Sequence, residues 1–214
     1  MFVANRMTKN PVTVTPDTKV DEAAALMKKN HFRRLPVVDD GKLVGFLNDK
    51  DIMQVAPSPA TTLSRYEITS LLAKICIREI MQKDVISVNE DATIEEAALL
   101  MCNNKIGGLP VVSSVGAVVG VITETDIFKA LVDVMGLNDG TTRLTLEVDN
   151  KVGVVKDIAG VFAEAGLSID SLVTCKKDSG KYEIVIRGDI PSVEDITAKL
   201  SQKGYHVIHT VKIG

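Results

Sequence analysis

The sequence predicts a mixed α/β fold, of the α+β type, in which a β-α-β-β-α unit occurs twice and a βαββαβ unit follows. A segment made of Gly, two apolar residues, a small polar residue and, three positions later, Asp occurs at residues 45–51 and again at 120–126. The residues that precede it repeat too, which indicates duplication of a whole unit. After residue 137 the pattern changes, and alternating apolar positions predict the strands of a separate domain.

The composition is that of a globular chain able to bury a core. The 214 residues are 45% hydrophobic and 25% charged, and the net charge of -3 offers no broad basic surface for nucleic acid. Cys76, Cys102 and Cys175 are odd in number and lack a C-x-x-C spacing, which predicts free thiols in a reducing compartment. No apolar leader opens the chain and no run of about 18 apolar residues follows, so we expect a cytoplasmic protein without a membrane span.

The repeat covers nearly the whole of each unit. Met7 aligns with Met81 at an offset of 74, and the same offset pairs the Leu-Pro-Val-Val stretch at 35–38 with that at 109–112. One inserted residue near Val115 raises the offset to 75 for the rest of the unit. We therefore place the first unit at residues 1–60 and the second at 77–137.

The elements follow in the same order in each unit. An extended piece at 12–14 or 86–88 precedes a helix with apolar residues at helical spacing, and Thr93 with Glu96 predicts a capping box in the second copy. The Leu-Pro-Val-Val strand comes next. Because proline has no N–H for a ladder, we expect Pro36 and Pro110 at a strand start or edge. A tight turn, at 40–41 in the first copy, leads into the strand and helix that close the unit.

The duplicated strand-to-helix turn is the candidate for chemistry. Asn48 or Thr123 can cap the first free N–H groups of the following helix. Asp51 or Asp126 then sits in the first turn, where the helix dipole favours a carboxylate. Capping alone explains one such turn, whereas two copies inside a longer repeat indicate a binding function as well.

These motifs resemble those of tandem CBS domains, also called a Bateman module, over roughly residues 1–135. The first copy departs from the family's Gly-apolar-apolar-[Thr/Ser]-x-x-Asp turn at Asn48. The resemblance implies clefts for an adenine nucleotide, with AMP or ATP expected first and S-adenosylmethionine as the alternative. A carboxylate can accept hydrogen bonds from both ribose hydroxyls, and a helix N-terminus suits a phosphate. The nucleotide-binding residues expected on this basis are Val12, Thr13, Arg34, Leu35, Pro36, Asn48, Asp51, Ile86, Ser87, Gly108, Leu109, Pro110, Thr123 and Asp126.

The two clefts are expected to differ. Gly107 and Gly108 leave room beside the slot of the second unit, whereas the matching residues of the first unit are Arg33 and Arg34. These arginines are either a solvated strand end or a contact for phosphate. We expect tighter adenosine binding in the cleft of the second unit, with Arg33 or Arg34 reaching over to the phosphate.

A helix is predicted between the units, within residues 61–76. Pro57 and Pro59 end the helix before it. An apolar stripe at helical spacing is expected to pack on the tandem units. Its members are Leu63, Ile68, Leu71, Leu72 and Ile75.

Residues 138–214 have the order βαββαβ, the split unit of ferredoxin-like domains. Gly, Asn and Asp at 136–140 predict a linker before it. The unit resembles an ACT domain, whose mark is an acidic residue on the first strand and a glycine at the following turn. The resemblance implies Asp149, Asn150, Val152 and Gly153 as candidate amino-acid-binding residues, although dimerisation is the role expected first. Gly153 has a second explanation in close packing of a helix on a strand.

No catalytic residue and no metal site is expected. The chain has no G-x-S-x-G elbow, no Walker loop and no C-x-x-C pair. His206 and His209 suggest a pair of metal ligands, but residues three apart on a regular strand face opposite sides. His31 is matched by Lys105 in the other copy, which indicates a surface residue.

Two CBS units followed by an ACT domain resemble the acetoin-utilisation proteins of the AcuB type, and the segment at 57–61 adds to the likeness. The resemblance implies a regulator, not an enzyme, that is linked to acetoin or acetyl-CoA metabolism and acts on an unknown target enzyme. We also expect a two-fold homodimer, because free edge strands of a ferredoxin-like unit favour pairing. The alternative is a structural adaptor whose clefts no longer bind a ligand.

Overall fold

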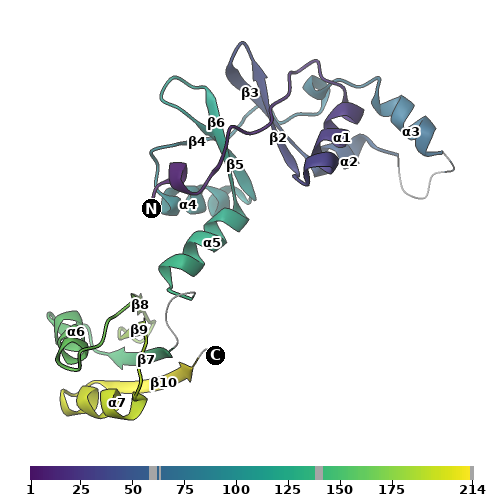
Figure 1. Ribbon diagram of the computed structural model, residues 1–214. Helices are drawn as coiled ribbons and strands as arrows, with labels where there is room; N and C mark the ends of the chain where they lie inside the picture. The colour runs from purple at the N-terminus through teal and green to yellow at the C-terminus, as the bar shows by residue number, and fades with distance from the viewer. Residues whose placement is uncertain (58–61, 63, 138–141, 213–214) are drawn as a thin grey trace. The chain divides into compact units, whose positions relative to one another are not determined.

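The computed structural model describes residues 1–57, 62, 64–137 and 142–212, in two compact units that divide the chain between residues 127 and 128 (Figure 1). The first unit holds the duplicated elements up to the start of the helix at 124–134, and the second holds the βαββαβ domain. The mixed α+β fold class is confirmed. Some of the sequence predictions concern positions outside the described residues. These are Pro59, Leu63, the linker at 138–140 and the domain bounds at 60, 61 and 138.

Each copy of the repeat contributes a helix, a pair of strands and a second helix. In the first copy these are α1 (Val20–Asn30), β2 (Arg34–Asp39), β3 (Lys42–Asn48) and α2 (Asp49–Val55). In the second copy they are α4 (Ile94–Asn104), β5 (Gly108–Val112), β6 (Val118–Thr123) and α5 (Glu124–Val134). The short pieces that start the copies are η1 (Val3–Asn5), β1 (Thr8–Lys9), η2 (Ile77–Glu79) and β4 (Val88–Asn89). The predicted order is confirmed from the first helix of each copy onward, whereas the extended piece predicted at 12–14 forms only an isolated bridge between Val14 and Val37.

Local chemistry explains several of these boundaries. Asp40 and Gly41 both have positive φ, as a tight turn between β2 and β3 requires. At the start of α4, Thr93 Oγ1 accepts from the Glu96 N–H at 3.2 Å, and the Glu96 carboxylate accepts from the Thr93 N–H at 2.7 Å, which is the predicted capping box. Pro110 lies in β5 just before the residues that pair with β4, so its strand is an edge at that point.

The two copies exchange their first segments. β1 of the first copy pairs with β6 of the second, where Lys9 lies opposite Gly120. In the same way Gln82, which matches Thr8 of the first copy, bridges to Phe46 in β3. The second copy's sheet therefore has the order β1-β6-β5-β4, with one strand from the other copy. The repeat in the sequence predicts the elements but carries no sign of this exchange.

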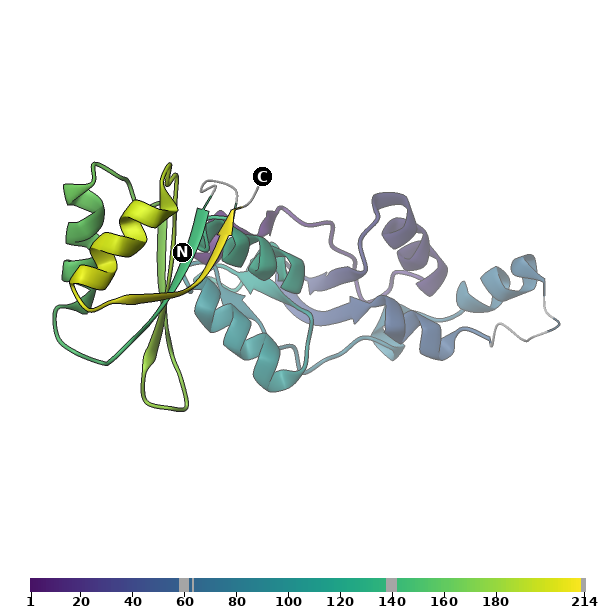
Figure 2. The ribbon, with the colours of Figure 1, turned by 90° about the horizontal axis from the view of Figure 1, so that it is seen from below.

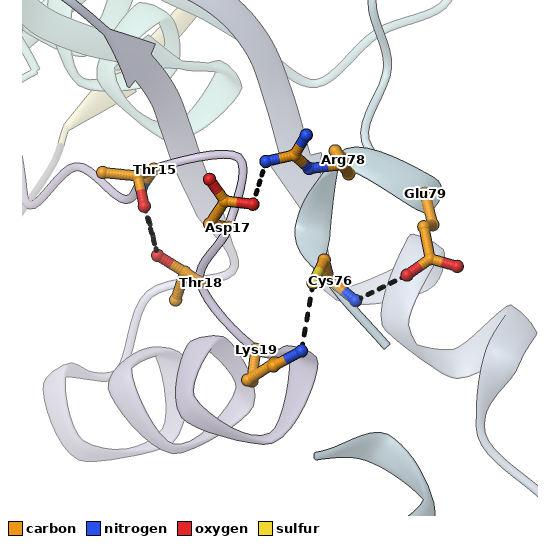
Figure 3. A network of polar contacts seen from close by, with 7 residues as sticks. All are labelled: Thr15, Asp17, Thr18, Lys19, Cys76, Arg78 and Glu79. Carbon is orange, nitrogen blue, oxygen red and sulfur yellow. Dashed lines mark hydrogen bonds and ion pairs between the residues drawn. The ribbon is translucent and has the colours of Figure 1, made fainter. Parts of the chain in front are cut away.

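Polar contacts tie the segment before α1 to the segment that enters the second copy (Figure 3). Asp17 forms an ion pair with Arg78, and Lys19 Nζ donates a hydrogen bond to Cys76 Sγ at 3.1 Å. The Glu79 carboxylate accepts from the Cys76 N–H at 2.8 Å. These contacts hold the start of the second copy beside α1.

The helix between the copies, α3 (Arg65–Leu72), packs only in part. Leu72 is buried, and Ile68 and Ile75 pack against the core of the first copy as predicted. Leu71, in contrast, is 42% exposed, so the predicted stripe is wrong at this residue. The side chain lies on the helix face that turns away from that core.

The second compact unit contains the predicted βαββαβ domain, whose elements lie within residues 142–212. Its antiparallel sheet has the order β10-β7-β9-β8, the ferredoxin-like arrangement. Two helices cover one face of the sheet, as Figure 2 shows, and Leu144, Phe162 and Ile186 are buried between the layers. The elements are β7 (Thr142–Val148), α6 (Val154–Glu164), β8 (Ser171–Lys176), β9 (Tyr182–Gly188), α7 (Val193–Gln202) and β10 (His206–Lys212).

Two expectations from the sequence concern the state of the cysteines and the presence of membrane-spanning helices. Cys76, Cys102 and Cys175 are all free, as predicted. In the part of the chain that the structure describes, every helix is too short or too polar to cross a membrane.

Candidate functional site

The strand-to-helix turn of the second copy places a carboxylate beside a hydroxyl. β6 ends at Thr123, and α5 begins at the next residue. Asp126 Oδ2 accepts a hydrogen bond from the Thr123 N–H at 2.9 Å and another from Thr123 Oγ1 at 2.7 Å. Both bonds end on one oxygen of a half-buried carboxylate. Capping of the helix is therefore compatible with a ligand on the other oxygen.

The matching turn of the first copy is more enclosed. Asn48 Oδ1 accepts from the Asp51 N–H at 3.1 Å, and Asp51 Oδ2 accepts from the Asn48 N–H at 2.8 Å. Only 8% of Asp51 is exposed. This burial raises the pKa of its carboxyl, although the bonds to Asn48 act in the opposite direction. The aspartate beside Asn48 is thus less open to a ligand than Asp126.

A cavity of about 350 Å³ opens at the turn of the second copy. Its walls come from the segment after β1, from the residues between α1 and β2, and from the turn between β6 and α5, so both copies contribute. The volume lies in the range of roughly 300–1,000 Å³ that is usual for small-molecule sites. The lining residues are Thr8, Asn10, Pro11, Val12, His31, Phe32, Arg33, Arg34, Gly107, Val121, Thr123, Glu124 and Thr125.

Arg34 lies across the glycine pair of the second copy. A Cβ at Gly107 would stand 2.6 Å from Arg34 Nη2 and 2.9 Å from Glu124 Oε2, and a Cβ at Gly108 would stand 3.0 Å from Arg34 Nε. The room left by the glycines is therefore filled by this arginine and does not stay open beside the slot. Burial and the neighbouring Arg33 lower the pKa of the Arg34 guanidinium, which still remains a cation at neutral pH.

The cavity brings together only part of the predicted nucleotide-binding set. Val12, Arg34 and Thr123 line it. Five predicted residues are instead buried in β2 and β5, namely Leu35, Pro36, Gly108, Leu109 and Pro110. The other predicted residues that do not line it are Thr13, Asn48, Asp51, Ile86, Ser87 and Asp126.

Several residues that line the cavity were not among the residues predicted from the sequence. Thr8, Asn10 and Pro11 belong to the first copy by sequence, and they reach the cavity because β1 crosses to the second copy. His31 is exposed, as expected of a surface residue, but it also lines the cavity. The available signal was a histidine two residues before a pair of arginines next to a strand start, because all three side chains can donate hydrogen bonds to an anion.

The histidines of β10 share one face of the sheet, contrary to the sequence expectation. A β-bulge between Val207 and His209 shifts the register, so His206 lies opposite Glu147 and His209 opposite Thr145. Because these partners are two residues apart in β7, their side chains point to the same side. Within the described ranges, no group of three or more His, Cys, Asp or Glu residues is arranged to hold a metal ion.

A smaller cavity of about 230 Å³ lies in the second unit, at the turn from β7 into α6. Asp149, Asn150 and Gly153 line it, whereas Val152 is fully exposed and does not. Lys151 Nζ lies 3.1 Å from Asp149 Oδ2 in an exposed ion pair. Gly153 caps α6 with a φ of +94°, a conformation that glycine adopts without strain.

Comparison with protein families gives matches for the two repeat copies and for the βαββαβ domain. Residues 3–58 and 77–133 match the CBS domain family, and residues 142–204 match the ACT domain family. The CBS matches cover both copies of the repeat, and the ACT match covers most of the βαββαβ domain.

Three solved structures resemble the region of the repeats. A putative acetoin utilization protein (AcuB) from Vibrio cholerae is 30% identical, with a TM-score of 0.53 over 65% of this chain and 96% of that one. The CBS domain pair of protein MJ0100, in complex with 5-methylthioadenosine and S-adenosyl-L-methionine, is 31% identical, with a TM-score of 0.51 over 61% and 95%. CBSX2 from Arabidopsis thaliana, in complex with AMP, is 29% identical, with a TM-score of 0.50 over 61% and 96%.

Curated relatives differ in how much of their length the chain spans. It spans 44% of an uncharacterized protein from Methanocaldococcus jannaschii, which is 35% identical over 128 residues, or 58% of this chain. It spans 22% of an inosine-5'-monophosphate dehydrogenase from Korarchaeum cryptofilum, which is 36% identical over 120 residues, or 56% of this chain. In contrast, it spans 94% of a CBS domain-containing protein from Dictyostelium discoideum, 31% identical over 136 residues and 63% of this chain.

Proposed function

Because the chain belongs to the CBS-domain family and carries an ACT domain after its CBS pair, we propose that it is a regulatory protein that senses an adenine nucleotide. CBS pairs of related proteins bind AMP, or S-adenosyl-L-methionine with 5-methylthioadenosine. The ligand proposed here is AMP or ATP, and S-adenosylmethionine is the alternative. The proposed place is the cavity at the turn of the second copy.

The arrangement of charge and donors around that cavity is the observation that supports this proposal. Thr123 and the N-terminus of α5 suit a phosphate, and Arg33 and Arg34, which line the same cavity, supply positive charge. Asp126, within the same helix turn, can accept hydrogen bonds from ribose hydroxyls. Val12 offers an apolar contact for the base.

Calorimetric titration of the full chain with AMP, ADP, ATP and S-adenosylmethionine tests the proposal. We expect saturable binding of AMP or ATP, and a ligand at 100 times its dissociation constant should add about 2.7 kcal/mol to the free energy of unfolding. Binding of S-adenosylmethionine alone supports the alternative ligand. The absence of binding at millimolar concentrations supports the structural adaptor and refutes the sensor.

The proposed physiological role is control of a target enzyme in acetoin or acetyl-CoA metabolism, in the cytoplasm. The likeness to the acetoin utilization protein from Vibrio cholerae supports this role. A strain that lacks the gene should grow more slowly on acetoin than on glucose, and the wild-type gene should restore growth. Restoration by a variant that no longer binds nucleotide would separate the metabolic role from the sensing role.

A homodimer is part of the proposal. The edge strands β8 and β10 of the second unit offer unpaired backbone groups, which favour pairing with a second copy. Light scattering at micromolar concentration should give twice the mass of 23.1 kDa. A monomeric mass under these conditions refutes this part.

The cavity of the ACT domain supports a second ligand, a small amino acid. Asp149 or Asn150 would hold the ammonium group, and the backbone at the Gly153 turn would hold the carboxylate. Gly153→Leu should abolish any rise of the melting temperature caused by the amino acid and leave nucleotide binding intact. If no amino acid raises the melting temperature at millimolar concentrations, the domain serves dimerisation alone.

A further inference from the structure

Arg187 in β9 is a buried arginine with unpaired donors. Only 5% of the residue is exposed, and its Nε and Nη1 are enclosed with no hydrogen-bond partner among the described residues. A guanidinium stays charged in a protein, and leaving its buried N–H donors without an acceptor is costly. A negatively charged group that accepts hydrogen bonds from Nε and Nη1 would therefore stabilise Arg187.

The side chain of Arg187 lies on the sheet face opposite the two helices of the ACT domain. Ile184 and Ile186 of the same strand pack under the helices, so the alternation of β9 directs Arg187 to the other face. The strand register places Arg143 of β7 on one side of it and Ser171 of β8 on the other. Two arginines directly opposite each other repel, and this creates a local positive potential.

Two carboxylates on the same face of β9 and β7 pair with lysines. Glu183 and Glu147 lie four residues along β9 and β7 from the arginines, roughly 13 Å away at the rise of a strand. Lys177 Nζ lies 3.2 Å from Glu183 and 3.3 Å from Glu147, and Lys181 Nζ lies 2.8 Å from Glu147. These two glutamates therefore do not supply an acceptor for Arg187.

The end of α5 and the residues after it lie against Ser171 and Arg187, and they belong to the same compact unit. Ser171 Oγ donates a hydrogen bond to the Val134 carbonyl at 2.8 Å. Gly136 approaches so closely that a Cβ there would stand 2.9 Å from Ser171 Cβ and 3.6 Å from Arg187 Cδ. A second protein sheet cannot stack on Arg187 beneath this cover.

We propose that Arg187, together with Arg143 and Ser171, forms a binding site for a small oxyanion, a phosphate or a carboxylate, beneath the segment 134–137. The guanidinium fork matches two oxygens of such an anion. The Ser171 hydroxyl becomes a further donor when it leaves the Val134 carbonyl, so binding shifts the cover. This site is distinct from the cavity at Thr123 and from the cavity at Gly153.

Calorimetric titration of the full chain with inorganic phosphate, and separately with malonate, tests the site at constant ionic strength set with chloride. We expect one saturable site per chain for one of these anions and a melting temperature that rises with its concentration. Arg187→Met, similar in size but neutral, should lose both responses and be no less stable than the wild type in chloride. Arg78→Met is the matched control, because it removes an exposed arginine outside the proposed binding sites and should keep both responses.

Equal responses in the wild type and Arg187→Met overturn the proposal, as does the absence of saturable binding at millimolar concentrations. If Arg187→Met fails to fold, Arg187→Lys decides instead: it keeps the charge and loses the fork, so at least a tenfold lower affinity is expected. Light scattering tests whether the acceptor for Arg187 comes from a second protein chain. The wild type could bind neither anion and be a dimer that Arg187→Met converts into a monomer. In that case the acceptor belongs to a second copy of the chain, and the small-anion site is refuted.

Discussion

At the scale of single residues, the two duplicated aspartates have the same position in the repeat but different surroundings. Asp51 is buried and exchanges hydrogen bonds with Asn48, whereas Asp126 is half-buried and receives both of its bonds from Thr123. The 350 Å³ cavity opens beside Thr123. Asp126 does not line this cavity, but it is more exposed than Asp51 and lies three residues after Thr123.

This difference predicts unequal effects of removing each carboxylate. Asp126→Ala should weaken AMP or ATP binding by about 1.5–3 kcal/mol, or about ten- to a hundred-fold, because a charged hydrogen-bond acceptor is lost. Asp51→Ala should weaken binding less. Calorimetry on both variants measures this, and a loss for Asp51→Ala as large as that for Asp126→Ala would place the site in the other cleft.

The burial of Asp51 also predicts a dependence of stability on pH. Its pKa is raised in the folded state, so the folded protein holds this proton more tightly than the unfolded chain. This contribution to the free energy of unfolding is present below the unfolded pKa and is lost as the pH rises through the folded pKa. Asp51→Asn should therefore be more stable than the wild type at pH 7, with a difference that shrinks on acidification.

Urea unfolding at pH 7 and at pH 4 measures this change. Asp126→Asn is the matched control, because it makes the same exchange at the equivalent turn of the other copy. A gain for Asp51→Asn that is as large at pH 4 as at pH 7 would contradict burial of the charge as its cause.

At the scale of elements, the glycine that opens each duplicated strand marks the point where the other copy crosses. A Cβ at Gly45 would stand 2.3 Å from Met81 Sδ, and one at Gly120 would stand 2.3 Å from Met7 Sδ. A backbone carbonyl of the crossing segment lies only 3.3 Å and 3.2 Å from the same two points. The glycines are thus required by close packing between the copies.

Gly120→Ala should therefore lower the free energy of unfolding by about 1–3 kcal/mol through overpacking, and Gly45→Ala should do the same. Combining Gly120→Ala with Met7→Ala should restore part of the loss, because the shorter side chain frees space. Urea denaturation measures both effects. Gly160→Ala is the control: it lies in α6 with no atom within 4 Å of the added Cβ, so it should stabilise by about 0.5–1 kcal/mol. Equal effects at all three glycines would rule out the crossing contact.

At the scale of the whole molecule, the exchange makes the two copies depend on each other. β1 completes the sheet of the second copy, and Gln82 bridges to β3 of the first. The cavity is incomplete without both copies, since the residues around Arg34 and those around Thr123 come from different copies.

Fragments of the tandem module should therefore fold only together. Residues 1–76 and residues 77–137, expressed separately, should each lack a cooperative thermal transition by circular dichroism, and mixing them should restore one. Each fragment leaves a crossing segment without its partner strand and exposes apolar core surface. A cooperative transition in either fragment alone would show that the exchange is dispensable.

The sequence by itself determined the elements and the families. The repeat, its offset and the capping residues predict both β-α-β-β-α copies, and alternation predicts the βαββαβ domain. These features are local, because periodicity and caps act over a few residues along the chain. The resemblance to CBS and ACT domains rested on the same local motifs and is confirmed.

Only the tertiary structure decided which residues share a cavity. Thr8 and Pro11 meet Thr123 because β1 crosses to the other copy, and Arg34 fills the space over Gly107. The bulge in β10 likewise turned His206 and His209 to one face, against the regular alternation. Strand exchange, register shifts and the burial of Arg187 depend on contacts between segments far apart in sequence, and the pattern of neighbouring residues that defines an element does not encode them.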